Sequence, residues 1–161
     1  NTLRIENVGS ATKMDYQIRL YNSLAISTLV VLDMDDSGIN EYTQLLSRKT
    51  KSASEILQIK SAGMTRCELE DIVKIDAYAA MIKNEFNISV DTKVFKNRRK
   101  PWSDRLHQAA ANSPGVFDDK IETKIKTRIA DIVVEKGIDA IADYDREYIM
   151  NLVDAISRFA R

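Results

Sequence analysis

The stretch TLVVLDMDDSG, residues 28–38, decides the expected fold of this chain. It is a continuous apolar run, rich in Val and Leu, that ends at a cluster of carboxylates and a glycine. Such a run, bounded by a turn signal, is typical of a fully buried parallel strand. In open α/β sheets, ligands bind beyond the carboxyl ends of such strands. The stretch therefore predicts a parallel sheet and a candidate site at Asp33 and Asp35.

Asp33 and Asp35 are two residues apart, so in an extended segment their side chains leave the strand on the same side. Like charges this close are tolerated mainly where a cation or a solvated mouth neutralises them. Their hard oxygen atoms suit Mg²⁺ or Mn²⁺. The alternative is a helix N-terminus, in which Asp36 or Ser37 caps the next helix and the acids favour its positive end.

The segments on both sides of this stretch alternate between strand and helix patterns. Residues 3–8 alternate in the manner of a strand, and residues 14–24 repeat apolar side chains at helical spacing. Residues 39–51 predict a polar amphipathic helix, residues 55–60 another strand, and residues 69–86 a further helix. The order βαβαβα predicts right-handed crossovers and a parallel sheet with helices on both faces.

The second half of the chain has a different character. Its expected elements are a basic connector, a short helix, a break and two longer helices: residues 94–102, 103–111, 112–115, 118–135 and 145–160. Apolar stripes on the two longer helices predict core positions, and Gly137 can cap the first of them. We therefore expect an α/β core over residues 1–92 and a helical subdomain, with its basic connector, over residues 93–161.

Composition limits the class of protein. The 161 residues, 44% hydrophobic and 30% charged, suffice for one soluble domain with a real core. Lys and Arg (24) balance Asp and Glu (24), so any role with nucleic acid must rest on local patches. The single Cys67 excludes an internal disulfide framework, and we expect it to serve as a core residue in a cytoplasmic protein. No apolar stretch reaches the roughly 18 residues that a membrane span requires.

Two further clusters accompany the aspartates. Glu68-Leu69-Glu70-Asp71 follows the expected third strand, where it would face the same sheet edge as Asp33; the alternative is ordinary enrichment of acids in a first helical turn. The run from Lys93 to Trp102 contains no acid and two aromatic residues, so it can attract a polyanion. Its alternative is a solvated connector with the tryptophan in the core.

Taken together, these motifs carry a family resemblance. The order strand, Asn7-Val8-Gly9, helix, strand ending Leu32-Asp33-Met34-Asp35, then Glu68-Leu69-Glu70-Asp71 before a helix resembles the Toprim nuclease module of OLD-family ATP-dependent endonucleases. The resemblance covers most of the chain. It implies a Rossmann-like parallel sheet with a C-terminal helical extension, and an activity that hydrolyses DNA phosphodiester bonds with Mg²⁺ or Mn²⁺.

The resemblance also assigns roles to residues. Asp33 and Asp35 match the metal-binding pair, Glu70 matches the later glutamate, and Asp71 or Glu68 can assist it. Lys100 is the candidate that neutralises charge at the scissile phosphate. The expected nucleic-acid contacts are Lys96, Arg98, Arg99 and Lys100. His107 is expected to be a surface or capping residue, because no serine or second histidine accompanies it in a catalytic spacing.

Two features of the family pattern are absent from this sequence. The family's first catalytic glutamate precedes the region matched by residues 3–9, and no Gly-rich Walker A loop is present. We therefore expect an N-terminally truncated module, inactive or weakly active by itself. Its expected partners are DNA and the ATPase region of the same parent protein, through which it would form a homo-oligomer. A role in phage defence follows only from the resemblance.

Two other classes remain as alternatives. A non-catalytic Rossmann-like regulatory or interaction domain would use the acids to tune a switch or a partner interface, although a receiver domain needs an aspartate on a further strand and a later lysine. A phosphatase of the haloacid dehalogenase type also places a DxD pair after an apolar strand. Asp36-Ser37-Gly38 fits that second class poorly, because it expects Thr or Val there.

Overall fold

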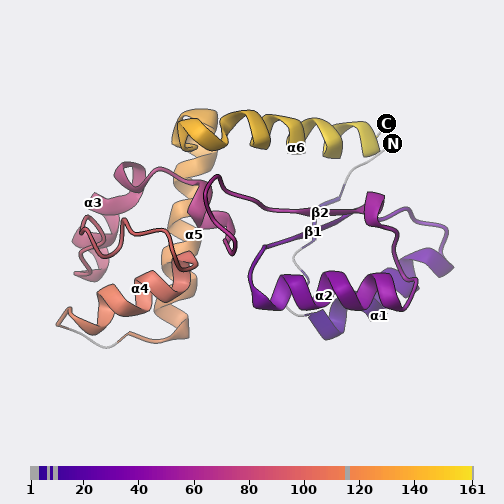
Figure 1. Ribbon diagram of the computed structural model, residues 1–161, viewed down its shortest axis with the longest axis horizontal. Helices are drawn as coiled ribbons and strands as arrows, with labels where there is room; N and C mark the ends of the chain where they lie inside the picture. The colour runs from indigo at the N-terminus through magenta and orange to yellow at the C-terminus, as the bar shows by residue number, and fades with distance from the viewer. Residues whose placement is uncertain (1–3, 7, 9–10, 115–116, 161) are drawn as a thin grey trace. The chain divides into compact units, whose positions relative to one another are not determined.

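The computed structural model describes residues 4–6, 8, 11–114 and 117–160 (Figure 1). These residues form a mixed α/β structure that is mostly helical and contains a small parallel sheet. The chain divides into two compact units, residues 1–59 with 147–161, and residues 60–146. The domain boundary suggested by the sequence, between residues 92 and 93, lies inside the second unit. None of the described helices is long and apolar enough to cross a membrane.

The first unit contains the predicted strand and its partner. β1 (Val30–Leu32) pairs in parallel with β2 (Ile56–Gln58), as the sequence predicts, and Val30 lies opposite Ile56. The expected full burial is wrong for Val31, which is 42% exposed between two buried neighbours. Successive side chains of a strand point to opposite faces of the sheet. Val31 therefore lies on the face opposite to Val30 and Leu32, and this face is less covered than the apolar sequence suggested.

The sheet is smaller than the sequence suggested. Of the expected first strand, residues 3, 7 and the following Gly9 lie outside the described residues, and residues 4–6 and 8 are not in a strand. The sheet of the described residues therefore has two strands, in the order β1-β2. The mixed α/β class and the parallel pairing are confirmed, while a larger Rossmann-like sheet stays a prediction.

Helices pack on this sheet as the apolar spacing predicts. α1 (Ala11–Ser23) and α2 (Asp36–Ser47) lie side by side (Figure 1). One buried cluster joins these helices to both strands, and its members are Ile18, Val30, Leu32, Leu45 and Ile56. The core of the first unit is therefore made by residues from all four elements.

α6 (Arg146–Phe159) confirms the last predicted helix, and the Tyr148 hydroxyl ties it to β2 by donating to the Gln58 carbonyl. Its expected core stripe comprised Ile149, Leu152, Val153, Ile156 and Phe159. Only Leu152 is buried, whereas Val153 is 54% and Phe159 37% exposed. The stripe gives the helix an apolar face, but the described residues cover only part of it.

The second unit is helical. Its long elements are α3 (Ile75–Phe86), α4 (Trp102–Ala111) and α5 (Asp119–Lys136), and Gly137 ends α5 with a positive φ of 58°, as predicted. Short 3₁₀ turns occupy Leu69–Ile72, Gly137–Ala140 and Asp143–Asp145. Trp102 is fully buried and makes edge-to-face contacts with Tyr78 and Phe95, so the core alternative for this tryptophan is confirmed.

The helix expected from residue 69 starts later, at Ile75. Glu68 and Asp71 form a reciprocal capping box around the 3₁₀ turn Leu69–Ile72, and Val73 then becomes extended. Val73 pairs with Ile141 in an isolated antiparallel bridge. This long-range bridge interrupts the helix, which a local periodicity cannot reveal.

A close approach makes glycine necessary at position 38. A Cβ atom at Gly38 would overlap the backbone carbonyl oxygen of Asp33, where β1 passes into α2. We expect Gly38→Ala to lower the free energy of unfolding by roughly 1–3 kcal/mol, because the strand end must shift to relieve the overlap. Urea denaturation measures this loss. Ser37→Ala, at an exposed position in the same turn, should change stability by less than about 0.5 kcal/mol, and equal losses would contradict the steric explanation.

A buried lysine joins the beginnings of the two strands. The Lys51 side chain is 3% exposed, and its ammonium donates to the Thr28 carbonyl (2.6 Å) and to Glu55 (2.7 Å) in the 3₁₀ turn Ala53–Glu55. Together with hydrogen bonds from Ser52, this ammonium lowers the pKa of Glu55 from 4.5 to about 2. Glu55 is thus ionised in the folded state at pH values where the unfolded chain is protonated.

The sign of this shift gives a pH prediction. Glu55 stabilises the folded state above about pH 4.5, and the contribution is lost as the pH falls towards 2. We expect Glu55→Gln to be less stable than the wild type at pH 7, by ~1 kcal/mol or less because Glu55 is 41% exposed. The difference should close between pH 4.5 and 2 in urea denaturation. Glu147→Gln, at an exposed position, serves as the control, and a pH-independent difference would contradict the prediction.

Candidate functional site

Asp33 and Asp35 follow the carboxyl end of β1, as the sequence predicts. Both side chains are half-buried. Asp35 is the N-cap of α2 and accepts a hydrogen bond from the Gly38 amide (2.7 Å), so the cap is neither Asp36 nor Ser37. Because an ionised carboxylate has about four acceptor positions, this one capping bond is compatible with further ligands. The capping and metal-binding interpretations of Asp35 are therefore not mutually exclusive.

The second acidic cluster belongs to the other unit, and its members have different surroundings. Asp71 is buried and accepts hydrogen bonds from the amides of Glu68 (2.9 Å) and Trp102 (3.1 Å). Its other oxygen pairs with the Arg105 guanidinium, which is also buried. Burial raises the pKa of Asp71, and these donors oppose that rise. The described contacts assign Asp71 a structural role, which its position in an acidic motif did not suggest.

Glu68 and Glu70 lie around a lysine. The Lys126 ammonium on α5 is 3.0 Å from Glu68, 4.0 Å from Glu70 and 3.3 Å from Glu122. Burial acts to lower the pKa of Lys126, but these carboxylates outweigh it and hold the pKa above its usual value. One ammonium group therefore offsets part of the negative charge of these three carboxylates.

Neighbouring polar side chains extend this cluster. The Ser103 hydroxyl lies 2.6 Å from Glu68 and 2.7 Å from Glu122. His107 contacts the other oxygen of Glu122 at 2.9 Å, and its ring packs edge-on against Phe117. Ser103 and His107 bind separate oxygens of one carboxylate, which is not the order in which a nucleophile, a base and an orienting acid act.

No metal centre is evident from side-chain geometry in the part of the chain that is described. Residues 4–6, 8, 11–114 and 117–160 contain no group of three or more His, Cys, Asp or Glu side chains that could hold an ion. Asp33 and Asp35 belong to the first unit, and Glu70 and Asp71 to the second. The binding of Mg²⁺ or Mn²⁺ by these four residues stays a prediction.

The residues predicted to contact nucleic acid differ in whether they already have partners within the protein. Arg98 turns into its own unit, where it donates to the Ser61 hydroxyl and lies 4.5 Å from the Tyr144 ring centre. Ser61 in turn donates to the buried Asp145. Lys96 forms an ion pair with Asp91. These two cations already have intramolecular partners.

Arg99 and Lys100 are exposed and share a basic pocket of about 400 Å³. Its lining residues come from the connector and from α4: Lys93, Val94, Asn97, Arg99, Lys100, Arg105 and Gln108. Lys93 was part of the basic run, but its pocket position was not predicted. Arg105 and Gln108 were not predicted at all, because they join the connector only through the folding of α4 onto it.

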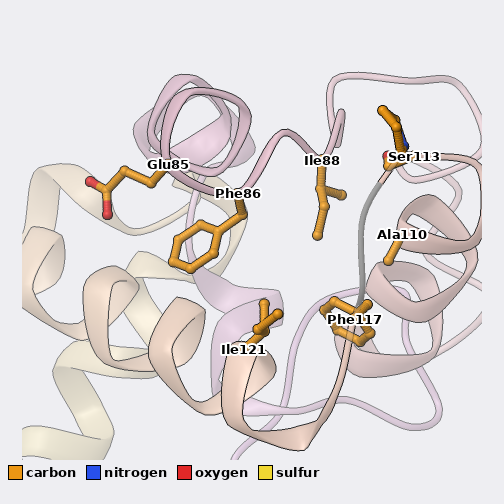
Figure 2. A pocket seen from close by; sticks show the side chains of 8 residues that line it. Glu85, Phe86, Ile88, Ala110, Ser113, Phe117 and Ile121 are labelled. Carbon is orange, nitrogen blue, oxygen red and sulfur yellow. The ribbon is translucent and has the colours of Figure 1, made fainter.

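A second pocket is apolar and smaller, about 200 Å³ (Figure 2). Phe86, Ile88, Phe117 and Ile121 surround it. Figure 2 shows the Glu85 carboxylate pointing away from the cavity, and Glu85 pairs with Arg128. The pocket therefore offers mainly apolar contact, and Glu85 of its lining is already paired with Arg128.

The buried Asp71–Arg105 pair predicts a large effect of mutation. We expect Asp71→Asn to lower the free energy of unfolding by about 3–5 kcal/mol, because it leaves the Arg105 charge buried without its carboxylate. Urea denaturation measures the loss. Asp104→Asn, which removes an exposed carboxylate from α4, should cost less than about 0.5 kcal/mol. A wild-type midpoint for Asp71→Asn would show that the pair does not support the fold.

The resemblance to OLD-family nucleases rests on the sequence motifs and on their order along the chain. Comparison with protein-family models, with curated proteins and with solved structures finds no significant match to this chain.

Proposed function

We propose that this chain is a metal-dependent DNA endonuclease or nickase module that hydrolyses phosphodiester bonds. In this proposal it is the Rossmann-like Toprim part of a larger ATP-dependent, OLD-like nuclease. The observation that supports it most is the pair Asp33 and Asp35, placed directly after a parallel strand and before α2. In α/β proteins this is the position at which ligands bind.

The residues after β1 suit a hard divalent cation. Asp33 and Asp35 are half-buried carboxylates, which are the oxygen ligands that Mg²⁺ and Mn²⁺ prefer. A bound cation supplies activation of water and neutralisation of charge on the phosphodiester. Asp35 would hold its position through the capping bond to Gly38, which fixes the carboxylate relative to α2. The capping bond thus orients a ligand rather than competing with it.

The other predicted site residues have different roles in this proposal. Glu70 enters the proposal through the resemblance alone, and within its own unit its carboxylate lies 4.0 Å from the Lys126 ammonium. Asp71 supports the fold by holding Trp102 and Arg105. Lys100 is exposed and has the charge to bind a phosphate oxygen.

The second candidate is a non-catalytic Rossmann-like regulatory or interaction domain. It is favoured by the structural use of the acids, since Asp35 caps a helix and Asp71 pairs with a buried arginine. In that case the carboxylates stabilise elements and need no metal. Metal binding and DNA cleavage distinguish the two candidates.

The test compares the wild-type chain with Asp33→Ala, each by itself and each extended by the upstream part of the parent protein that the proposal implies. The measurements are Mn²⁺ binding and nicking of supercoiled plasmid with Mn²⁺ or Mg²⁺. We expect Asp33→Ala to lose about 100-fold or more of the nicking rate, because it removes a group that stabilises developing charge through the metal. Asp154→Ala, at an exposed position of α6, is the matched control and should behave as wild type.

The outcomes separate the candidates. Nicking by the wild type and by Asp154→Ala, but not by Asp33→Ala, would support the nuclease. Metal binding without nicking would favour the regulatory domain. If neither the wild-type chain nor its extended form binds Mn²⁺ or nicks DNA, the nuclease proposal is overturned.

A further inference from the structure

The basic pocket concentrates positive charge from two segments. Lys93, Arg99 and Lys100 come from the connector and are exposed, and Arg105 comes from α4 and is buried. Its lining contains no acidic side chain, and the amides of Asn97 and Gln108 add neutral donors. Arg105 is already paired with Asp71, but the three exposed cations have no carboxylate in the lining and create a positive potential, which favours an anionic ligand.

Arg105 gives this pocket a fixed, incompletely satisfied donor. The guanidinium is anchored because one terminal nitrogen donates to the Phe95 carbonyl (2.6 Å) and the other pairs with Asp71. Its centre also lies 4.8 Å from the Phe95 ring centre. A further donor, Nε, is buried and has no hydrogen-bond partner among the described residues. Arg105 therefore contributes a guanidinium of fixed position to the lining of the pocket.

We propose that the basic pocket binds a phosphate group, supplied by the sugar–phosphate backbone of DNA. Phosphate accepts several charge-assisted hydrogen bonds at once, and guanidinium groups match its geometry better than a single ammonium does. The volume of about 400 Å³ is in the range of ligand sites and accommodates a nucleotide unit. The choice of DNA as the source of the phosphate rests on the proposed function.

This binding site is distinct from the metal-dependent chemistry. Its residues belong to the second unit, and none of them is a carboxylate that would hold Mg²⁺ or Mn²⁺. Lys100 then acts in binding the backbone together with Lys93 and Arg99, and its contribution requires no metal. The pocket should therefore bind DNA in the presence of a chelator.

The experiment measures DNA binding without cleavage. A fluorescent single-stranded oligonucleotide is titrated with the full 161-residue chain in EDTA, and anisotropy is followed over a series of NaCl concentrations. We expect Arg99→Ala with Lys100→Ala to weaken binding at least ~10-fold. The slope of log affinity against log salt should fall by ~0.7 for each lost phosphate contact. Both substituted side chains are exposed, so the fold should be unaffected.

The matched control removes the same charge elsewhere in the second unit. Lys120→Ala with Lys124→Ala takes two exposed cations from α5 that do not line the pocket. This variant should retain wild-type affinity within about twofold, since distant charges are screened at moderate salt. An equal loss of affinity in both double variants would overturn the proposal that this pocket binds phosphate and would indicate general charge attraction.

Competitors identify the ligand. Inorganic pyrophosphate should displace the oligonucleotide from the wild type and much less effectively from the Arg99/Lys100 variant. Polyglutamate at the same charge concentration should compete weakly. Competition by polyglutamate that equals or exceeds that of pyrophosphate would overturn the assignment to phosphate and indicate an acidic protein partner.

The binding and cleavage experiments fail independently. Asp33→Ala should bind the oligonucleotide in EDTA as the wild type does, because Asp33 does not line the pocket. If no plasmid is nicked but the Arg99/Lys100 variant loses affinity selectively, the nuclease proposal fails and the phosphate pocket stands. If nicking requires Asp33 but both double variants bind the oligonucleotide as the wild type does, the proposal of a phosphate pocket is overturned and the nuclease proposal is supported.

Discussion

The carboxylate of Asp71 is the constraint on which the second unit depends most. It receives the Glu68 amide at the start of the 3₁₀ turn, the Trp102 amide at the start of α4, and the guanidinium of Arg105. Segments more than thirty residues apart thereby converge on one buried group. If one partner of such a buried group is removed, the desolvation cost of the remaining partner is no longer offset. The loss of any one of the three contacts therefore weakens the other two.

This constraint also shapes the candidate binding surface. Asp71 fixes Arg105 through one terminal nitrogen, and Arg105 lines the basic pocket. The basic run, uniform in sequence, is divided by the fold. Arg98 points into its own unit and Lys96 binds Asp91, while Arg99 and Lys100 remain exposed. Only part of the run therefore has charge to offer a ligand.

In the first unit, Asp35 connects the strand β1 to the helix α2. Asp35 ends the region after β1 and begins α2, because its side chain accepts the Gly38 amide. The turn is so close that Gly38 has no room for a side chain beside the Asp33 carbonyl. A junction held this firmly is a suitable place for a ligand-binding carboxylate, since little conformational entropy remains to be lost on binding.

The sequence by itself determined the local elements: the parallel strands around Val30 and Ile56, most helices, the Gly137 cap and the DxD position after β1. These depend on apolar periodicity and on residues near in the chain. Tertiary structure alone decided that Val73 pairs with Ile141 and delays α3, and that Val153 of α6 stays exposed. It also decided that Asp71 is occupied by Arg105 and that Arg105 and Gln108 complete the basic pocket. A charged side chain has the same appearance in sequence whether it faces water or a buried partner, because that difference depends on contacts with distant residues.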